Sequence, residues 1–145
     1  MAERYLNLHT KYLEEADALI LKGDYVQASE NLWGAAAEIV KAVGALRGIE
    51  LKTYGDLFQY VAKLRDELKD PELSRLFHVV NSLHQNFYEG NQPPSFVTDG
   101  AKRETRLHTS LITRQNSQMI ERIKFKKFQL LNYISCGVRF LLLPF

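Results

Sequence analysis

The chain has 145 residues and a net charge of +2 at pH 7, and 46% of its residues are hydrophobic while 25% are charged. These values are ordinary for a soluble globular domain. The single cysteine, Cys136, excludes an internal disulfide and fits a reducing compartment. The N-terminus lacks the apolar core of a signal peptide, and Asn132, Gly137 and Arg139 interrupt the apolar stretch near the C-terminus, which excludes a membrane-spanning helix there. We therefore expect a soluble, cytoplasmic protein.

Charge is distributed unevenly along the sequence. Residues 1–100 carry 10 Lys and Arg against 15 Asp and Glu, a net charge of −5, whereas residues 101–145 carry 9 against 2, a net charge of +7. The basic segment either complements the acidic body, within the chain or between subunits, or binds nucleic acid by neutralising phosphates. We favour the first interpretation because apolar residues separate the basic ones. The candidates for nucleic-acid binding are Lys102, Arg103, Arg106, Arg114, Lys124, Lys126 and Lys127.

Two helices are predicted in the first third of the chain. Apolar residues recur at helical spacing over residues 3–22, and Gly23 ends that helix because glycine adopts the left-handed cap without a steric penalty. Asp24 then caps a second helix that runs to about Leu46. Trp33, the only tryptophan, lies on a wide apolar face of this helix among small residues, so we expect it to be buried between other helices.

Two further helices are predicted over residues 54–69 and 71–89. Each carries an apolar stripe, and Asp70-Pro71 separates them because proline disfavours helix in the preceding residue but suits a first turn. A loop with two prolines follows at residues 90–94. Residues 99–129 look helical but are poorly patterned, and residues 128–143 form either a last helix or a strand.

These elements predict an all-α fold, an up-and-down antiparallel bundle of four to five helices. Residues 1–97 form the core of the bundle. Residues 98–145 form a basic and apolar extension, irregular or helical, that packs on the bundle or on a partner subunit. The apolar end of the chain favours self-association, because such a surface needs cover.

One group of polar side chains, on the predicted helix of residues 71–89, could carry chemistry. His84, Tyr88 and Asn81 border its apolar face, and a histidine with polar neighbours can act as a general base. The alternative, which we favour, is that His84 and Tyr88 are rim residues with apolar bodies and hydrogen-bonded tips. The candidate catalytic residues are His84, Asn81, Tyr88 and Arg75.

Other site chemistries find little support in the sequence. The four histidines include no pair at i, i+4, and Cys136 has no cysteine partner, so no metal site is predicted. The sequence has no nucleophile motif and no glycine-rich phosphate loop, and no cofactor is expected.

Several short motifs in combination resemble a known family. They are Gly23-Asp24-Tyr25 with Ala28, Leu32-Trp33 with Ala35-Ala36-Ala37, Arg47-Gly48, Gly55-Asp56-Leu57, and Asn81-Ser82-Leu83-His84 with Asn86-Phe87-Tyr88-Glu89. With these motifs, residues 5–97 resemble the archaeal PaREP repeat-family proteins, which in turn are similar to the HEPN superfamily of small helical bundles. The resemblance implies an archaeal cytoplasmic protein, commonly a homodimer, in a toxin–antitoxin or nucleotidyltransferase-associated system.

The resemblance also implies two activities. Some HEPN relatives bind a nucleotidyltransferase partner, and many are metal-independent ribonucleases that use an arginine followed, after four to six residues, by a histidine. Arg4 to His9 and Arg103 to His108 have this spacing, at a frequency that chance explains, and neither pair lies on the helix of residues 71–89. Beyond residue 98 the chain departs from the family pattern, either as a genuine extension or through a shifted reading frame.

Our leading hypothesis is therefore a self-associating or partner-binding helical module, without assembled catalytic machinery. The alternatives are a HEPN-type ribonuclease and a protein that binds nucleic acid through its basic C-terminal segment.

Overall fold

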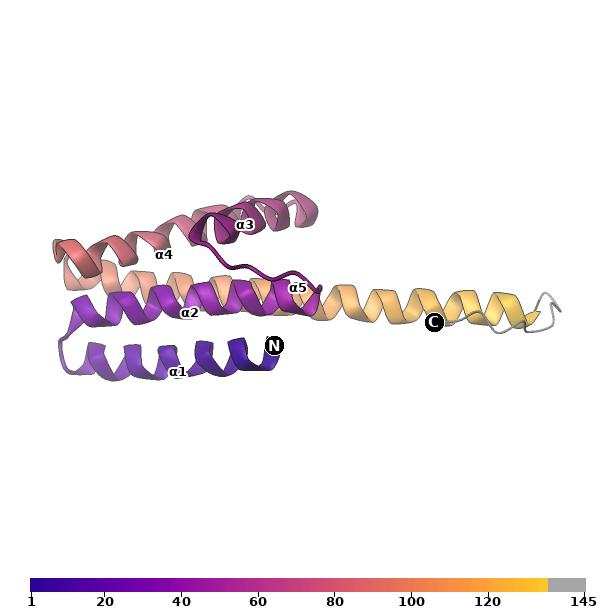
Figure 1. Cartoon of the computed structure of the whole chain (residues 1–145), viewed down its shortest axis with the longest axis horizontal. Helices are drawn as coiled ribbons and strands as arrows, with labels where there is room; N and C mark the ends of the chain where they lie inside the picture. The colour runs from indigo at the N-terminus through magenta and orange to yellow at the C-terminus, as the bar shows by residue number, and fades with distance from the viewer. Residues whose placement is uncertain (136–145) are drawn as a thin grey trace. The chain divides into compact units, whose positions relative to one another are not determined.

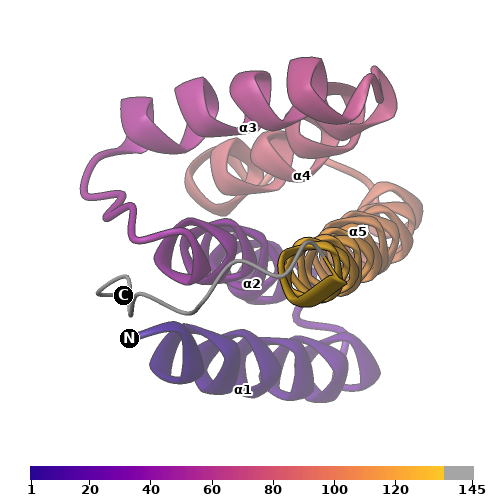
Figure 2. The ribbon, with the colours of Figure 1, turned by 90° about the vertical axis from the view of Figure 1, so that its right-hand side faces the viewer.

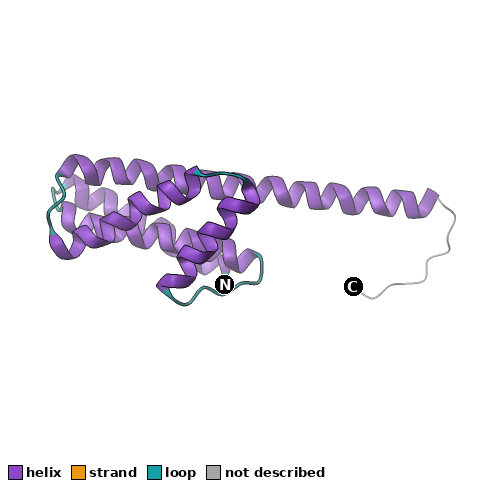
Figure 3. Ribbon diagram, turned by 90° about the horizontal axis from the view of Figure 1, so that it is seen from above, coloured by secondary structure: helices purple, strands orange, loops and turns teal. Residues whose placement is uncertain are grey.

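The structure, a computed structural model, describes residues 1–135, and beyond residue 118 it describes the side chains of Glu121, Lys124, Phe125 and Phe128 alone. The described residues form five helices and no strand (Figure 3). The helices are α1 (Ala2–Leu21), α2 (Tyr25–Leu46), α3 (Tyr54–Leu68), α4 (Glu72–Glu89) and α5 (Pro94–Ser135) (Figure 1). The prediction of an all-α bundle is confirmed. The stretch predicted as a last helix or strand is helical as far as Ser135, and its remainder lies outside the described residues.

The chain divides into two compact units, Met1–Ile112 and Thr113–Phe145. The first part of α5, as far as Ile112, belongs to the first unit. Three residues of that part lie in the core of the bundle, namely Val97, Leu107 and Leu111. Within the described residues, no helix combines the length and the apolar character needed to cross a membrane.

The predicted boundary between α1 and α2 is confirmed, and a side-chain cap fixes the start of α3. Gly23 has a positive φ of +78°, and the side chain of Asp24 accepts a hydrogen bond from the backbone N–H of Gln27 at 3.1 Å. At the start of α3, Thr53 accepts from the N–H of Asp56 at 3.1 Å, and Asp56 accepts from the N–H of Thr53 at 2.8 Å. This reciprocal capping box satisfies two N–H groups that would otherwise lack partners.

Helix α2 is the central element of the bundle, with α1, α3 and α4 packed against it (Figure 2). Its small residues permit close approach: a Cβ atom at Gly34 would lie 3.2 Å from the ring of Tyr12 in α1. Trp33 is 7% exposed, and its ring lies 5.5 Å from the rings of Phe77 and Tyr54. The prediction that Trp33 is buried between helices is thus confirmed.

Candidate functional site between α2, α3 and α4

A buried polar link fixes α2 against the end of α4. The side-chain amide of Asn86 donates to the hydroxyl of Ser29 at 2.9 Å, and Ser29 donates to the carbonyl of Tyr25 at 2.8 Å. The side-chain oxygen Oδ1 of Asn86 accepts a hydrogen bond from the backbone N–H of Gln92 at 2.8 Å. Because these groups are paired, their burial is tolerated, and the link sets how α2 lies along α4.

A histidine–carboxylate pair lies beside this link and nearer the surface. Nδ1 of His84 lies 2.8 Å from Oε2 of Glu30, and both side chains are half-buried. A hydrogen bond from this histidine to an ionised carboxylate uses the N–H at Nδ1, because the carboxylate can only accept, and in that tautomer Nε2 carries the lone pair. A carboxylate that fixes the tautomer in this way orients a histidine for proton transfer.

Three aromatic rings surround His84. The ring centroids of Trp33, Tyr54 and Tyr88 lie 5.5, 6.2 and 5.3 Å from that of His84, with Tyr88 at right angles to it. The hydroxyl of Tyr54 donates to Oδ1 of Asn81. Tyr88 is 72% exposed whereas Trp33 is buried, so the rings beside His84 range from the core to the surface.

The structure therefore brings three of the four candidate catalytic residues into one site, and it places Arg75 elsewhere. Arg75 lies nine residues before His84, on the opposite side of α4 by helical periodicity. Its guanidinium donates to Glu72 at 2.8 Å. This hydrogen bond lowers the pKa of Glu72, and the positive charges of Arg106 and Arg103 in α5 lower it further. Arg75 thus shares its surroundings with basic residues of α5.

The basic residues singled out as nucleic-acid contacts are distributed along α5. Arg103 pairs with Asp99 at 3.4 Å, and Lys124 pairs with Glu121 at 3.1 Å, both at helical spacing. Exposed pairs of this kind remain available to another anion, because they contribute little free energy. Of the others, Lys102 and Arg106 are exposed, Arg114 is half-buried, and the side chains of Lys126 and Lys127 lie outside the described ones.

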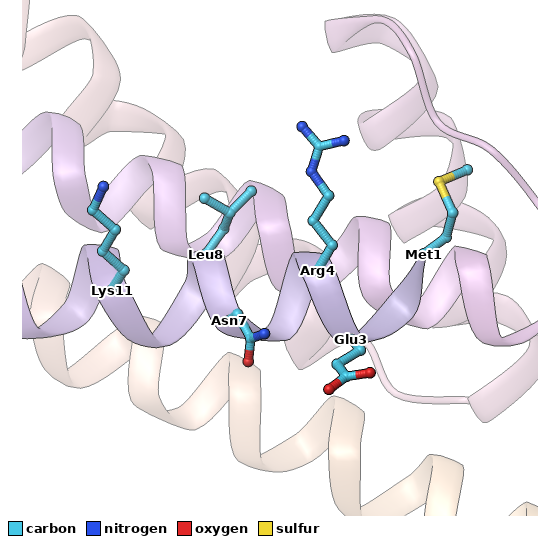
Figure 4. A pocket seen from close by; sticks show the side chains of 6 residues that line it. All are labelled: Met1, Glu3, Arg4, Asn7, Leu8 and Lys11. Atoms are coloured by element: carbon cyan, nitrogen blue, oxygen red, sulfur yellow. The ribbon is translucent and has the colours of Figure 1, made fainter.

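The two arginine–histidine pairs with ribonuclease-like spacing, Arg4 with His9 and Arg103 with His108, do not form sites. Arg4 lines a shallow cavity of about 550 Å³ along the first turns of α1 (Figure 4). His9, in contrast, is buried. Arg103 pairs with Asp99, as described above. The two histidines instead face each other, because the ring centroids of His9 and His108 lie 4.5 Å apart. The cavity is lined by Met1, Glu3, Arg4, Asn7, Leu8 and Lys11.

Glu104 completes this second group of titratable side chains. It is 0% exposed, and its Oε1 lies 3.5 Å from Nδ1 of His9. Burial raises the pKa of Glu104 to about 7 and lowers the pKa of both His9 and His108. The burial of Glu104 could be predicted from the sequence. Glu104 continues the helical spacing of Val97, Gly100, Leu107 and Leu111, so a carboxylate occupies a core position of that helix.

No group of three or more histidine, cysteine or acidic side chains in the described part of the chain could hold a metal ion.

These features define a small all-helical bundle with a histidine–carboxylate pair at the junction of three helices. Residues 4–108 match the archaeal PaREP1/PaREP8 family, and the chain belongs to that family. The expected resemblance to the PaREP family is confirmed. Among solved structures, the chain is similar to the crystal structure of a Sulfolobus solfataricus protein, a structural-genomics target, with a TM-score of 0.64 and 24% identity, over 73% of this chain and 94% of that one. This likeness shows a shared fold. No curated protein is significantly similar in sequence.

Proposed function

We propose that this protein is a self-associating helical module in which the second half of α5 docks on another copy of the chain. The observation that carries the proposal is the exposure of Phe125 and Phe128, at 62% and 61%. They lie three residues apart and so share one face of α5. A helix that presents large apolar side chains to solvent gains stability by packing them against a partner.

Charge supports a second copy as that partner. The segment after residue 100 has a net charge of +7, whereas the first 100 residues have a net charge of −5. Opposite charges on the two surfaces would accelerate their encounter and favour this pairing over like-charged alternatives. Two copies could each offer a basic helix to the acidic bundle of the other, which is the arrangement of a closed dimer.

Sedimentation velocity over micromolar concentrations tests the proposal. The wild-type chain is expected to be a dimer, and the double variant Phe125→Ser with Phe128→Ser is expected to dissociate at least tenfold more readily. Leu21→Ser is the matched control, because Leu21 is an exposed apolar residue at the end of α1, and it should leave the dimer intact. A wild-type chain that remains monomeric throughout would contradict self-association.

The geometry of His84 favours a second candidate, metal-independent cleavage of RNA. Its Nδ1 bond to Glu30 leaves Nε2 as a general base, and the exposed ring of Tyr88 offers a stacking surface for a base. Asn81 would contribute a hydrogen-bonding amide. Arg75 would hold the RNA backbone from the other side of α4 and would not touch the reacting atoms.

Incubation with mixed RNA tests this candidate. Cleavage should be lost in His84→Gln, which keeps a polar group beside Glu30, and retained in His78→Gln, which changes an exposed histidine on the same helix. Equal cleavage by the wild-type chain and His84→Gln would remove His84 from the reaction.

A further inference from the structure

Three titratable side chains meet in the interior of the first unit, away from the site around His84. We call His9 of α1 with Glu104 and His108 of α5 the buried cluster. Oε1 of Glu104 lies 3.5 Å from Nδ1 of His9, and the rings of His9 and His108 lie 4.5 Å apart. His9 and Glu104 are buried and His108 is half-buried.

The buried cluster joins three helices and leaves some of its polar atoms unsatisfied. The N–H at Nδ1 of His9 donates a hydrogen bond to the carbonyl oxygen of Ala35 in α2, with 2.9 Å between the nitrogen and the oxygen. Nε2 of His9 and both carboxylate oxygens of Glu104 are buried without a hydrogen-bond partner among the described residues. A net charge on buried side chains without hydrogen-bond partners destabilises the folded state, because no neighbouring group stabilises that charge.

The remaining charged groups that face the buried cluster come from α2. Glu38 acts electrostatically on His9 and favours its protonated form. Glu38 is itself paired with Lys41 at 2.9 Å, so the two residues together add no net charge. The charge of the buried cluster therefore depends on how many protons its own three members hold.

A single proton gives the buried cluster a net charge of zero. This holds whether the proton is on the carboxyl of Glu104 or on an imidazole, because one arrangement is wholly neutral and the other is an ion pair. A second or third proton places net positive charge in the interior, with two histidine rings in contact. Burial therefore favours the one-proton state, whichever atom carries the proton.

We propose that His9, Glu104 and His108 form an acid-sensitive clamp, which accommodates one proton, holds the first part of α5 against α1 and α2 at neutral pH, and loosens on acidification. The directions of the pKa shifts agree with this. The pKa of Glu104 is raised, so it keeps a proton in the folded state, and the pKa values of His9 and His108 are lowered, so they resist one.

The pH dependence of stability is set by the difference in bound protons between the unfolded and the folded state. With ordinary pKa values, the three side chains of an unfolded chain bind about two protons at pH 5 and about one at pH 6.5. The folded clamp holds about one proton at both values. Unfolding thus takes up a proton on the acid side, and the buried cluster by itself raises the unfolding equilibrium constant about sevenfold between pH 6 and pH 5.

Two variants of the full chain test the clamp in opposite directions. In Glu104→Gln the folded state holds no proton, so acidification from pH 6 to pH 5 should raise its unfolding constant about eightfold more than that of the wild type. In His108→Asn the unfolded state takes up one proton fewer, so the same acidification should raise its unfolding constant about eightfold less. Urea unfolding followed by far-ultraviolet circular dichroism gives both ratios, and other titrating groups cancel in them.

His78→Asn is the matched control for the loss of a histidine, because His78 is exposed and lies outside the buried cluster. Ratios for Glu104→Gln and His108→Asn that stay constant from pH 6 to pH 5, or that move in the same direction, would overturn the proposal. If Glu104→Gln does not fold, the ratio for His108→Asn decides the question by itself.

Discussion

The contact between α4 and α5 is tight enough that one added methyl group should disturb it. A Cβ atom at Gly100 of α5 would lie 2.7 and 2.9 Å from the two terminal carbons of Leu83 and 3.2 Å from its Cγ. Leu83 is 1% exposed and belongs to the hydrophobic core, so it has little room to turn away. We therefore predict that Gly100→Ala destabilises the protein even though alanine is the better helix former.

The magnitude follows from two opposing effects. Replacing glycine by alanine in a helix interior stabilises it by roughly 1 kcal/mol. Forcing an extra carbon into a packed core typically costs about 1–3 kcal/mol, and three atoms at 2.7–3.2 Å put this site within that range. The expected net result is a loss of about 1 kcal/mol in the free energy of unfolding.

Gly55→Ala provides the matched control for this prediction. Gly55 is an exposed residue in the first turn of α3, and its added Cβ would meet only Oγ1 of Thr53, at 3.8 Å. Its stability should rise by a few tenths of a kcal/mol. Chemical denaturation of the two variants at one pH gives the comparison. If Gly100→Ala is as stable as Gly55→Ala, the contact with Leu83 is not tight and the reasoning fails.

Two further predictions concern hydrogen bonds. Asn86→Ala removes a buried amide that donates to Ser29 and accepts from the N–H of Gln92, so urea unfolding should show a loss of about 2 kcal/mol, against little change in Asn91→Ala, an exposed loop residue. Thr53→Ala removes the side-chain acceptor at the start of α3 and should lower the free energy of unfolding by about 1 kcal/mol, whereas Thr53→Ser, which keeps the hydroxyl, should retain most of it.

The sequence predicts the helices well because their signals are local. Gly23 and Asp24 mark one boundary, and both adopt the roles expected of them. The burial of Trp33 follows from the apolar face on which it lies. Helix α5 starts at Pro94, in agreement with the preference of proline for a first helical turn, whereas the two prolines predict a loop that extends through residue 94.

The composition of the site is only partly predictable, since it depends on which helices meet. Helical periodicity places Glu30 on the polar side of its helix, and His84 lies 54 residues later. Nothing in either segment identifies the other as its partner. Arg75 and His84 belong to the same helix, but they lie on different faces of it. Membership in one helix therefore does not place two residues in one site.

Burial separates the roles of the two histidine–carboxylate pairs in this protein. His84 and Glu30 are 2.8 Å apart and half-buried, so the pair can exchange a proton with solvent or with a bound molecule. His9 and Glu104 are 3.5 Å apart and buried, so their charge state acts on stability instead. Variants of His84 should therefore alter activity or binding, and variants of the buried pair should alter the acid response of folding.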